Sequence, residues 1–215
     1  KQAIARGVET VKIKIVGPSL ASQWDTLDAV REAIGKTALR LDANRTLSPE
    51  TAARELASLV PLEPELVEEP VPTAALGAPG AFTSSEVPLA LDESLQEPGV
   101  WARLEPCLAE LGCVAVVLKP MALGGLLACL DLAARATSRG LDVTVSHLFD
   151  GPVGLAAAAH LALAVGSRKR ASGLDRHGGL GAWPAVDIPH LTPTNVMVGE
   201  RPGLGIAAVP NGDPA

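Results

Sequence analysis

The sequence is poor in aromatic residues, with two Phe, three Trp and no Tyr among 215 residues. Ala, Leu and Val must therefore build the apolar core, for which a hydrophobic content of 47% is ample. Cysteine is also scarce, and Cys107, Cys113 and Cys129 form no C-x-x-C pair. An odd, widely spaced set of this kind indicates reduced, mostly buried thiols and a cytoplasmic protein.

Positive charge and long apolar runs are limited as well. The net charge is −6 and the longest basic run is residues 168–170, so a nucleic-acid-binding surface is not expected. The longest uncharged run, residues 151–167, is interrupted by Pro and Gly; it predicts a buried helix and not a membrane span. No signal peptide is visible. Because the sequence starts at Lys1, without Met and in what reads as mid-element, we expect a piece of a longer protein.

Short apolar runs alternate with helix-like stretches along the chain. Strands are predicted at residues 11–16, 38–42, 66–69, 88–92, 114–119 and 142–146, with a weaker one near 171–175. Helices are predicted at residues 23–34, 50–60, 99–111, 124–139 and 153–165. Ser22 and Ser48 are the expected N-caps of the first two helices. This alternation is typical of an α/β fold with a parallel sheet.

The set of strands favours a (β/α)₈ TIM-like barrel that lacks its first strand. A doubly wound open sheet is the less favoured alternative, because no glycine-rich phosphate loop follows the first predicted strand. The barrel would occupy residues 1–188. Residues 189–215, rich in Pro and Gly, would form an irregular C-terminal segment that packs over the domain.

The first predicted strand raises a charge problem. Val11, Ile13 and Ile15 alternate with Lys12 and Lys14, so both lysines lie on one face of the strand. Two ammonium groups so close together repel each other, and burying either is costly. One lysine alone would be expected to reach water from the strand end.

Catalytic groups of a barrel lie at the carboxyl ends of its strands. Here three successive predicted strands end in carboxylates, and the strands on either side end in lysines. The residues are Lys12 and Lys14, then Asp42, Glu68-Glu69 and Asp92-Glu93, then Lys119. Each acid alone is more often a turn, cap or loop residue, but their order at successive strand ends favours one joint site.

Asp42, Glu68 and Asp92 could converge on one Mg²⁺ and leave positions for water and a substrate oxygen. The metal would offset the charge problem of the two lysines. It would also lower the pKa of a neighbouring lysine, and a lysine ready to lose its proton is a general base.

Taken together, five short motifs resemble the enolase superfamily, and within it the muconate-lactonizing-like branch. They are K-I-K (12–14), D-A-N (42–44), E-E-P (68–70), D-E-S (92–94) and L-K-P-M-A-L-G-G (118–125). The resemblance implies a modified (β/α)₈ barrel that follows an N-terminal α+β capping domain. The capping domain and the first barrel strand are then absent from this chain, and residues 189–215 would pack on the barrel or on the capping domain.

The resemblance also implies roles for single residues. Lys14 matches the general base, Lys12 tunes it, and Lys119 matches the lysine on the opposite face of the substrate. Asp42, Glu68 and Asp92 match the ligands of Mg²⁺, for which Mn²⁺ could substitute. Glu68 is preferred to Glu69 because relatives keep the first acid of this motif. The superfamily uses a Lys or His base with Mg²⁺.

Within the branch, residues 144–163, 178–183 and 199–206 are similar to o-succinylbenzoate synthases. This similarity implies substrate contacts from Asn44, Gly124, Ser146 and Gly151. His147 and Asp150 stand where such enzymes often have Ser and Glu, and His147 alone is expected to be an ordinary loop residue.

The implied function is a lyase of menaquinone biosynthesis that dehydrates 2-succinyl-6-hydroxy-2,4-cyclohexadiene-1-carboxylate to o-succinylbenzoate. An N-acylamino acid racemase or a dipeptide epimerase is the alternative, although an epimerase would need acids on the last strand and only Asp175 is available there. A non-catalytic binding barrel is the third hypothesis. The partners implied are a small-molecule carboxylate, the capping domain and, as an open alternative, a second copy of the chain; neither nucleic acid nor a membrane is expected.

Overall fold

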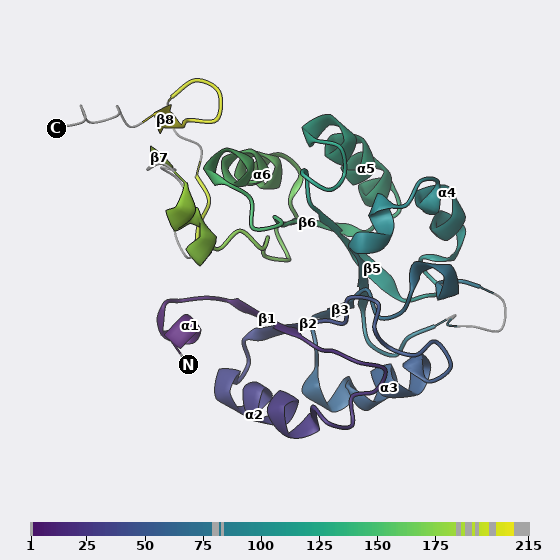
Figure 1. Cartoon of the computed structure of the whole chain (residues 1–215). Coiled ribbons are helices and arrows are strands. Elements are labelled where there is room, and N and C mark those ends of the chain that lie inside the picture. Colours follow the sequence, from purple (N-terminus) through teal and green to yellow (C-terminus); the bar gives the residue numbers. More distant parts are fainter. Residues whose placement is uncertain are drawn as a thin grey trace. The chain divides into compact units, whose positions relative to one another are not determined.

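The computed structural model describes residues 2–78, 82, 84–183, 186–187, 191, 194–197 and 201–208 (Figure 1). The chain divides into two compact units, residues 1–117 and 118–215. Most of the predicted C-terminal segment, residues 189–215, lies outside the described residues. Its assignment as a separate irregular segment therefore stays a prediction.

A parallel sheet organises the first unit. Its strands lie side by side in chain order: β1 (Thr10–Lys14), β2 (Ala38–Asp42), β3 (Leu66–Glu68), β4 (Leu89–Leu91) and β5 (Cys113–Leu118), the last of which runs into the second unit. β3 and β4 are buried throughout, as expected for parallel strands covered on both faces. The predicted strands are thus confirmed, with short differences at their ends.

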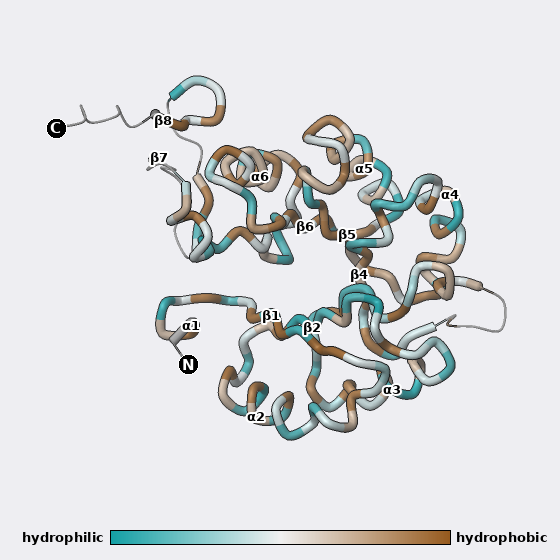
Figure 2. The backbone as a smooth tube through the Cα atoms, viewed as in Figure 1, coloured by the Kyte–Doolittle hydropathy of each residue, from teal (hydrophilic) through white to brown (hydrophobic). Residues whose placement is uncertain are grey.

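Helices and short 3₁₀ turns connect these strands. They are α1 (Gln2–Ala5), α2 (Trp24–Ile34), α3 (Ala52–Ser58), η1 (Val60–Leu62), η2 (Thr73–Ala75), η3 (Glu93–Gln96), α4 (Val100–Leu104) and η4 (Glu105–Cys107). Leu27 and Ile34 of α2 and Leu56 of α3 are buried. Each of the two helices therefore contributes apolar residues to the core, and its other positions include polar residues (Figure 2).

The first two long helices start later than the sequence predicts. The N-cap of α2 is Gln23 and not Ser22, because the Gln23 side chain bonds both the N–H and the carbonyl of Val16. The predicted helix 50–60 begins only at Ala52, since the Ser48 carbonyl accepts the N–H groups of Thr51 and Ala52 and forms a separate turn.

The predicted helix 99–111 is broken. α4 ends at Leu104 and continues as the 3₁₀ turn η4. Pro106 explains the break, because proline has no N–H to donate to the preceding helical turn.

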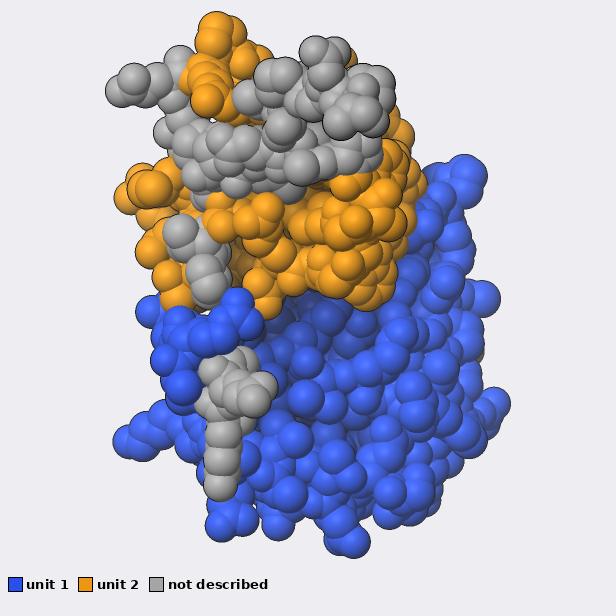
Figure 3. Space-filling model, turned by 60° about the vertical axis from the view of Figure 1, so that its left-hand side comes forward, with its two compact units in different colours: residues 1–117 blue, residues 118–215 orange. Residues whose placement is uncertain are grey.

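The second unit is coloured orange in Figure 3. It contains α5 (Leu126–Ser138), β6 (Asp142–Val145), α6 (Pro152–Val165), η5 (Gly178–Ala182), β7 (Val186–Asp187) and β8 (Ala207–Ala208). The N–H of Ser146, just after β6, donates to the carbonyl of Leu118 over 2.9 Å. The weak strand predicted near 171–175 is reduced to one isolated bridge between Ser146 and Gly173. Within the described part of the chain, no helix combines the length and apolarity needed to cross a bilayer.

The three cysteines are free thiols, as the sequence predicts. Burial raises the pKa of Cys113 to about 12 and that of Cys129 to about 11. At about pH 8 both are protonated and unreactive, because the thiolate is the nucleophile. We expect iodoacetamide to modify the half-buried Cys107 first and the other two only after unfolding, as measured by peptide mass spectrometry. Alkylation of native Cys113 as fast as that of Cys107 would contradict this burial.

Candidate active site

Strand register places three of the predicted site residues in one row. Lys14 pairs with Asp42, and Asp42 pairs with Glu68. Paired residues of parallel strands point their side chains to the same face, and Lys12, two residues before Lys14, shares that face. Lys12 and Lys14 are exposed whereas Ile15 is fully buried, so the predicted alternation of β1 is confirmed.

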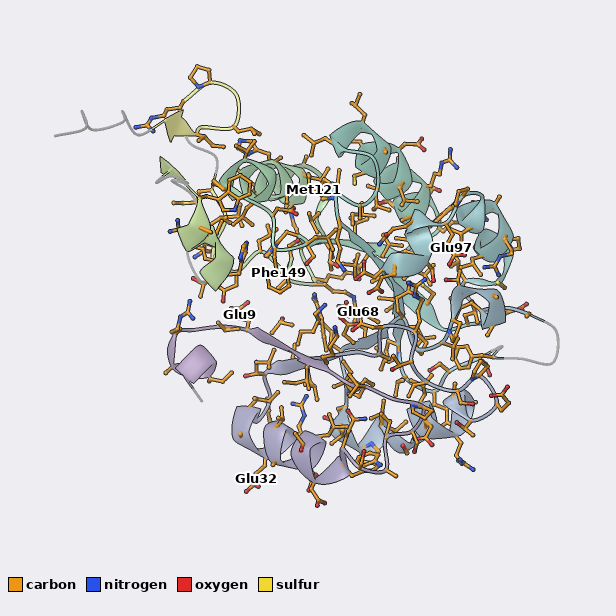
Figure 4. All side chains as sticks on the ribbon, viewed as in Figure 1. Glu9, Glu32, Glu68, Glu97, Met121 and Phe149 are labelled. Carbon is orange, nitrogen blue, oxygen red and sulfur yellow. The ribbon has the colours of Figure 1, made fainter. Side chains whose placement is uncertain are left out.

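Lys12 lies between two buried carboxylates. Its Nζ donates to Asp42 Oδ2 over 2.9 Å and to Glu68 Oε2 over 3.0 Å. Burial alone would lower the pKa of Lys12, but the charges of Glu68 and Asp42 outweigh this effect and raise that pKa well above its ordinary value. Lys12 is therefore a fixed cation at neutral pH. Glu68, labelled in Figure 4, extends from the end of β3 and provides one of the two acids.

Glu68 experiences opposing effects. Burial raises its pKa most, the Asp42 charge raises it further, and the Lys12 ammonium opposes both. Two acids this close and this buried favour a cation between them, because an uncompensated charge in the interior is costly.

The segment after β2 bends sharply at Asn44 and Arg45, whose φ values are 42° and 64°. The N–H of Asn44 donates to Asp42 Oδ1 over 3.1 Å, and its side-chain Nδ2 donates to Glu93 Oε1 over 2.6 Å. Asn tolerates this left-handed conformation better than most residues. Asn44 therefore joins the ends of β2 and β4, a bridge that the sequence did not predict. Its predicted contact with substrate stays a prediction.

Glu69 differs from its neighbour Glu68 in both direction and partners. Its φ of 43° turns it out of the strand, and its carboxylate is fully buried. Oε1 accepts the N–H groups of Asp92 and Ser94 over 2.6 and 2.9 Å, and Oε2 accepts the Ser94 hydroxyl over 2.6 Å. Burial is the main cause that raises the pKa of Glu69. The structure thus gives a physical reason for preferring Glu68 to Glu69 as a ligand.

The chemistry of these side chains fits a hard divalent cation. Asp42, Glu68 and Asp92 are 5%, 2% and 2% exposed and supply the carboxylate oxygens that Mg²⁺ prefers. Asn44 Oδ1 and Glu93 Oε2 are buried without a hydrogen-bond partner at the same strand ends. Across the residues described, however, no three His, Cys, Asp or Glu side chains are gathered as a metal cluster. The structure brings Asp42 and Glu68 together around Lys12, and Asp92 is buried directly after the neighbouring strand β4.

The second unit carries the other predicted residues. Lys119 is buried directly after β5. Gly124 has a φ of 86° in the turn before α5, and the Ser146 hydroxyl donates to the Gly173 carbonyl over 3.2 Å. A Cβ on Gly151, at the start of α6, would lie 2.7 Å from the ring of the exposed Trp183, so a larger residue here would require this ring to move. The substrate contacts predicted for Gly124, Ser146 and Gly151 stay predictions.

His147 lies in the loop after β6, as the sequence suggests, and both of its ring nitrogens have partners. Its Nδ1 accepts the N–H of Phe149 over 3.1 Å, so its Nε2 carries the proton and donates to the Asp175 carbonyl over 3.2 Å. Burial lowers the pKa of His147, and the charges of His177 and Lys119 lower it further.

His177 lies beside His147, with ring centroids 5.2 Å apart. Its Nε2 bonds the Asp150 carbonyl over 2.9 Å, and its Nδ1 is buried without a partner. Neither His177 nor Glu93 was assigned from the sequence. Glu93 could have been found, because it directly follows Asp92 at a strand end, whereas no pattern marks His177.

Comparison with known proteins identifies the family and the fold. A family model described as "Enolase C-terminal domain-like" matches residues 1–211. The chain is 32% identical to o-succinylbenzoate synthase of Haemophilus influenzae over 88% of this chain and 58% of that protein. It is 30% identical to L-Ala-D/L-Glu epimerase of Clostridium acetobutylicum over 97% of this chain and 58% of that protein.

A solved structure shows the same fold. The dipeptide epimerase from Cytophaga hutchinsonii, complexed with Mg and the dipeptide D-Ala-L-Val, matches with a TM-score of 0.79 and 26% identity over 98% of this chain and 56% of that one. The chain thus spans a little more than half the length of the relatives it matches. The predicted fold class is confirmed, and the chain belongs to the enolase superfamily, as its C-terminal barrel domain.

Proposed function

We propose that this chain is the barrel part of an o-succinylbenzoate synthase-like lyase. The observation that carries the proposal is the Lys12 ammonium held between the buried carboxylates of Asp42 and Glu68, with Lys14 in the same row. Lys14 lies on the same face of β1 as Lys12 and is exposed, so its amine is accessible to a substrate. The similarity to the Haemophilus influenzae enzyme supports this choice of reaction.

In this proposal Lys14 accepts the proton α to the carboxylate of 2-succinyl-6-hydroxy-2,4-cyclohexadiene-1-carboxylate. The electron pair of the broken C–H bond forms a ring double bond while the C–O bond to the ring hydroxyl breaks. Lys14 then returns its proton to the departing oxygen, so that water leaves and o-succinylbenzoate remains. Lys12 stays protonated throughout, and Lys119 would supply a cation near the ring.

Asp42, Glu68 and Asp92 would hold Mg²⁺, or Mn²⁺ in its place. When bound, the ion would withdraw electron density from the substrate carboxylate and make the adjacent C–H bond more acidic. The same residues would bind any small carboxylate with an acidic α proton. Substrate choice therefore depends on groups outside this set.

Epimerisation of a dipeptide, or racemisation of an N-acylamino acid, is the second candidate. The epimerase relative from Clostridium acetobutylicum covers 97% of this chain and favours it. Lys14 and Lys119 would then act as acid and base. The carboxylate available to a substrate ammonium would be Asp175, whose side chain accepts the Arg176 N–H over 2.9 Å. Shared sites of this kind are expected where function depends on the site and not on the fold.

Incubation of the full-length protein in D₂O with Mg²⁺ separates the candidates. We expect o-succinylbenzoate to form from the hydroxy-diene substrate, as followed by ultraviolet absorbance, with dipeptides and N-succinylamino acids turning over more slowly by NMR. Faster α-deuterium incorporation into a dipeptide would favour the epimerase. No Mg²⁺ binding by calorimetry at millimolar metal would favour a non-catalytic barrel.

A further inference from the structure

The Glu69 carboxylate connects the end of β3 to the end of β4. It is fully buried, and its Oε1 accepts the N–H of Asp92 over 2.6 Å and the N–H of Ser94 over 2.9 Å. A charged acceptor strengthens such bonds well beyond those of a neutral one. The backbone at Asp92 is therefore fixed by a side chain from the neighbouring strand.

A second contact holds the same segment from the other oxygen. Ser94 Oγ donates to Glu69 Oε2 over 2.6 Å and lies 2.9 Å from Thr73 Oγ1. Because the Ser94 proton goes to the carboxylate, Thr73 donates to Ser94. No more than 3% of the surface of Thr73, Ser94 or Glu69 is exposed. Water therefore does not compete for these hydrogen bonds.

The left-handed backbone of Glu69 separates it from Glu68. Glu68 directs its carboxylate to the Lys12 face, while Glu69 reaches across to β4. Such a conformation is costly for a non-glycine residue and persists where the surrounding contacts require it. The two adjacent acids therefore serve two different strand ends.

We propose that Glu69 is a positioning residue, which fixes the backbone at Asp92 and thereby presents the Asp92 carboxylate to a divalent cation. This inference rests on the proposed function, since it assigns Asp92 as a ligand. Removing a residue that orients a metal ligand by hydrogen bonds typically weakens metal affinity by about 10- to 100-fold.

Three substitutions at Glu69 distinguish the effect of its hydrogen bonds from the effect of its charge. Glu69→Ala removes all the contacts. Glu69→Asp keeps the charge but is one methylene too short to reach both N–H groups. Glu69→Gln loses the charge but keeps the contacts, because its Oε1 accepts both N–H groups and its Nε2 donates to Ser94 Oγ, which then donates to Thr73.

Calorimetric titration of the full-length protein with Mg²⁺ is the test. We expect Glu69→Ala and Glu69→Asp to weaken Mg²⁺ binding about 10- to 100-fold, and Glu69→Gln to stay within about 3-fold of the unmodified protein. Without metal, hydrogen exchange of the Asp92 and Ser94 amides should be faster in the Ala and Asp variants and unchanged in Gln. Should Glu69→Ala fail to fold, Glu69→Asp gives the decisive comparison.

Glu55 provides the matched control. It is 9% exposed and accepts the Leu20 N–H over 2.8 Å. It lies on α3 and is not part of the proposed site. Glu55→Ala should lower the free energy of unfolding and leave Mg²⁺ affinity unchanged.

If Mg²⁺ affinity depended on charge, so that Glu69→Asp bound Mg²⁺ normally and Glu69→Gln bound it weakly, the positioning role would be overturned. So would normal affinity in Glu69→Ala. Unmodified protein that binds no Mg²⁺ would overturn the proposed function together with this inference, whereas normal binding by unmodified protein and Glu69→Ala alike would overturn the inference alone.

Discussion

Lys14→Ala is expected to lower turnover about 1,000-fold, because a positioned general base contributes about 10²- to 10⁴-fold to proton transfer. Lys14 is exposed at the end of β1, so its loss should change the free energy of unfolding by less than about 0.5 kcal/mol. Steady-state kinetics with the hydroxy-diene substrate measure the first quantity, and urea unfolding measures the second.

Lys36→Ala is the matched control, since Lys36 is an exposed lysine in the turn after α2. It should leave turnover unchanged. Near-normal turnover in Lys14→Ala would remove Lys14 as the base. Equal losses in both variants would indicate a general effect of surface charge.

Lys12→Met is expected to destabilise the chain by about 2 kcal/mol at neutral pH. The substitution leaves Asp42 and Glu68 buried without their shared cation, and breaking a fully buried ion pair costs about 3–5 kcal/mol. The expected loss is smaller because the Lys12 side chain is 41% exposed and water screens part of the interaction. Thermal and urea unfolding at several pH values measure it.

The pH dependence has a definite sign. Burial raises the pKa of Glu68 above its ordinary value of 4.5, and Lys12 opposes this increase. Without Lys12 the Glu68 pKa rises further, so Glu68 stabilises the fold below pH 4.5 and loses this contribution as the pH rises through its folded pKa. The difference between Lys12→Met and the unmodified protein should therefore shrink toward pH 4.5.

Arg54→Met tests whether any lost ion pair has the same effect. Arg54 is 79% exposed and lies 3.7 Å from Glu55, so we expect a change below about 1 kcal/mol, as is usual for surface pairs. A pH-independent loss in Lys12→Met, or one no larger than in Arg54→Met, would contradict the assignment of Lys12 as the shared cation.

The sequence was most informative where the two-residue period of a strand determines both the face to which a side chain points and whether it is buried. Alternation in β1 predicted that Lys12 and Lys14 share a face, and the order of acids at strand ends predicted that Asp42 and Glu68 lie together. Both follow from parallel pairing, which brings successive strand ends to one edge. Superfamily resemblance added roles that periodicity alone does not provide.

The remaining features depend on contacts between residues far apart in the chain. The Asn44–Glu93 bridge and the Glu69 contacts to Asp92 and Ser94 join separate strands, and no local pattern indicates them. The start of α2 was misplaced for a local reason: Gln23, whose side chain bonds the backbone at Val16, directly precedes the helix in place of Ser22.

The pairing of Lys14 with Asp42 also limits how this chain can change in length. Arg31 donates to the carbonyls of Gly35 and Thr37 and so secures the short turn that delivers β2 in its register. A one-residue slip of β2 against β1 would turn Asp42 to the opposite face. Point substitutions that keep this register are therefore better tolerated than insertions or deletions that shift it. Such a shift would separate Asp42 from Lys14 and Glu68 although all three residues remain in the sequence.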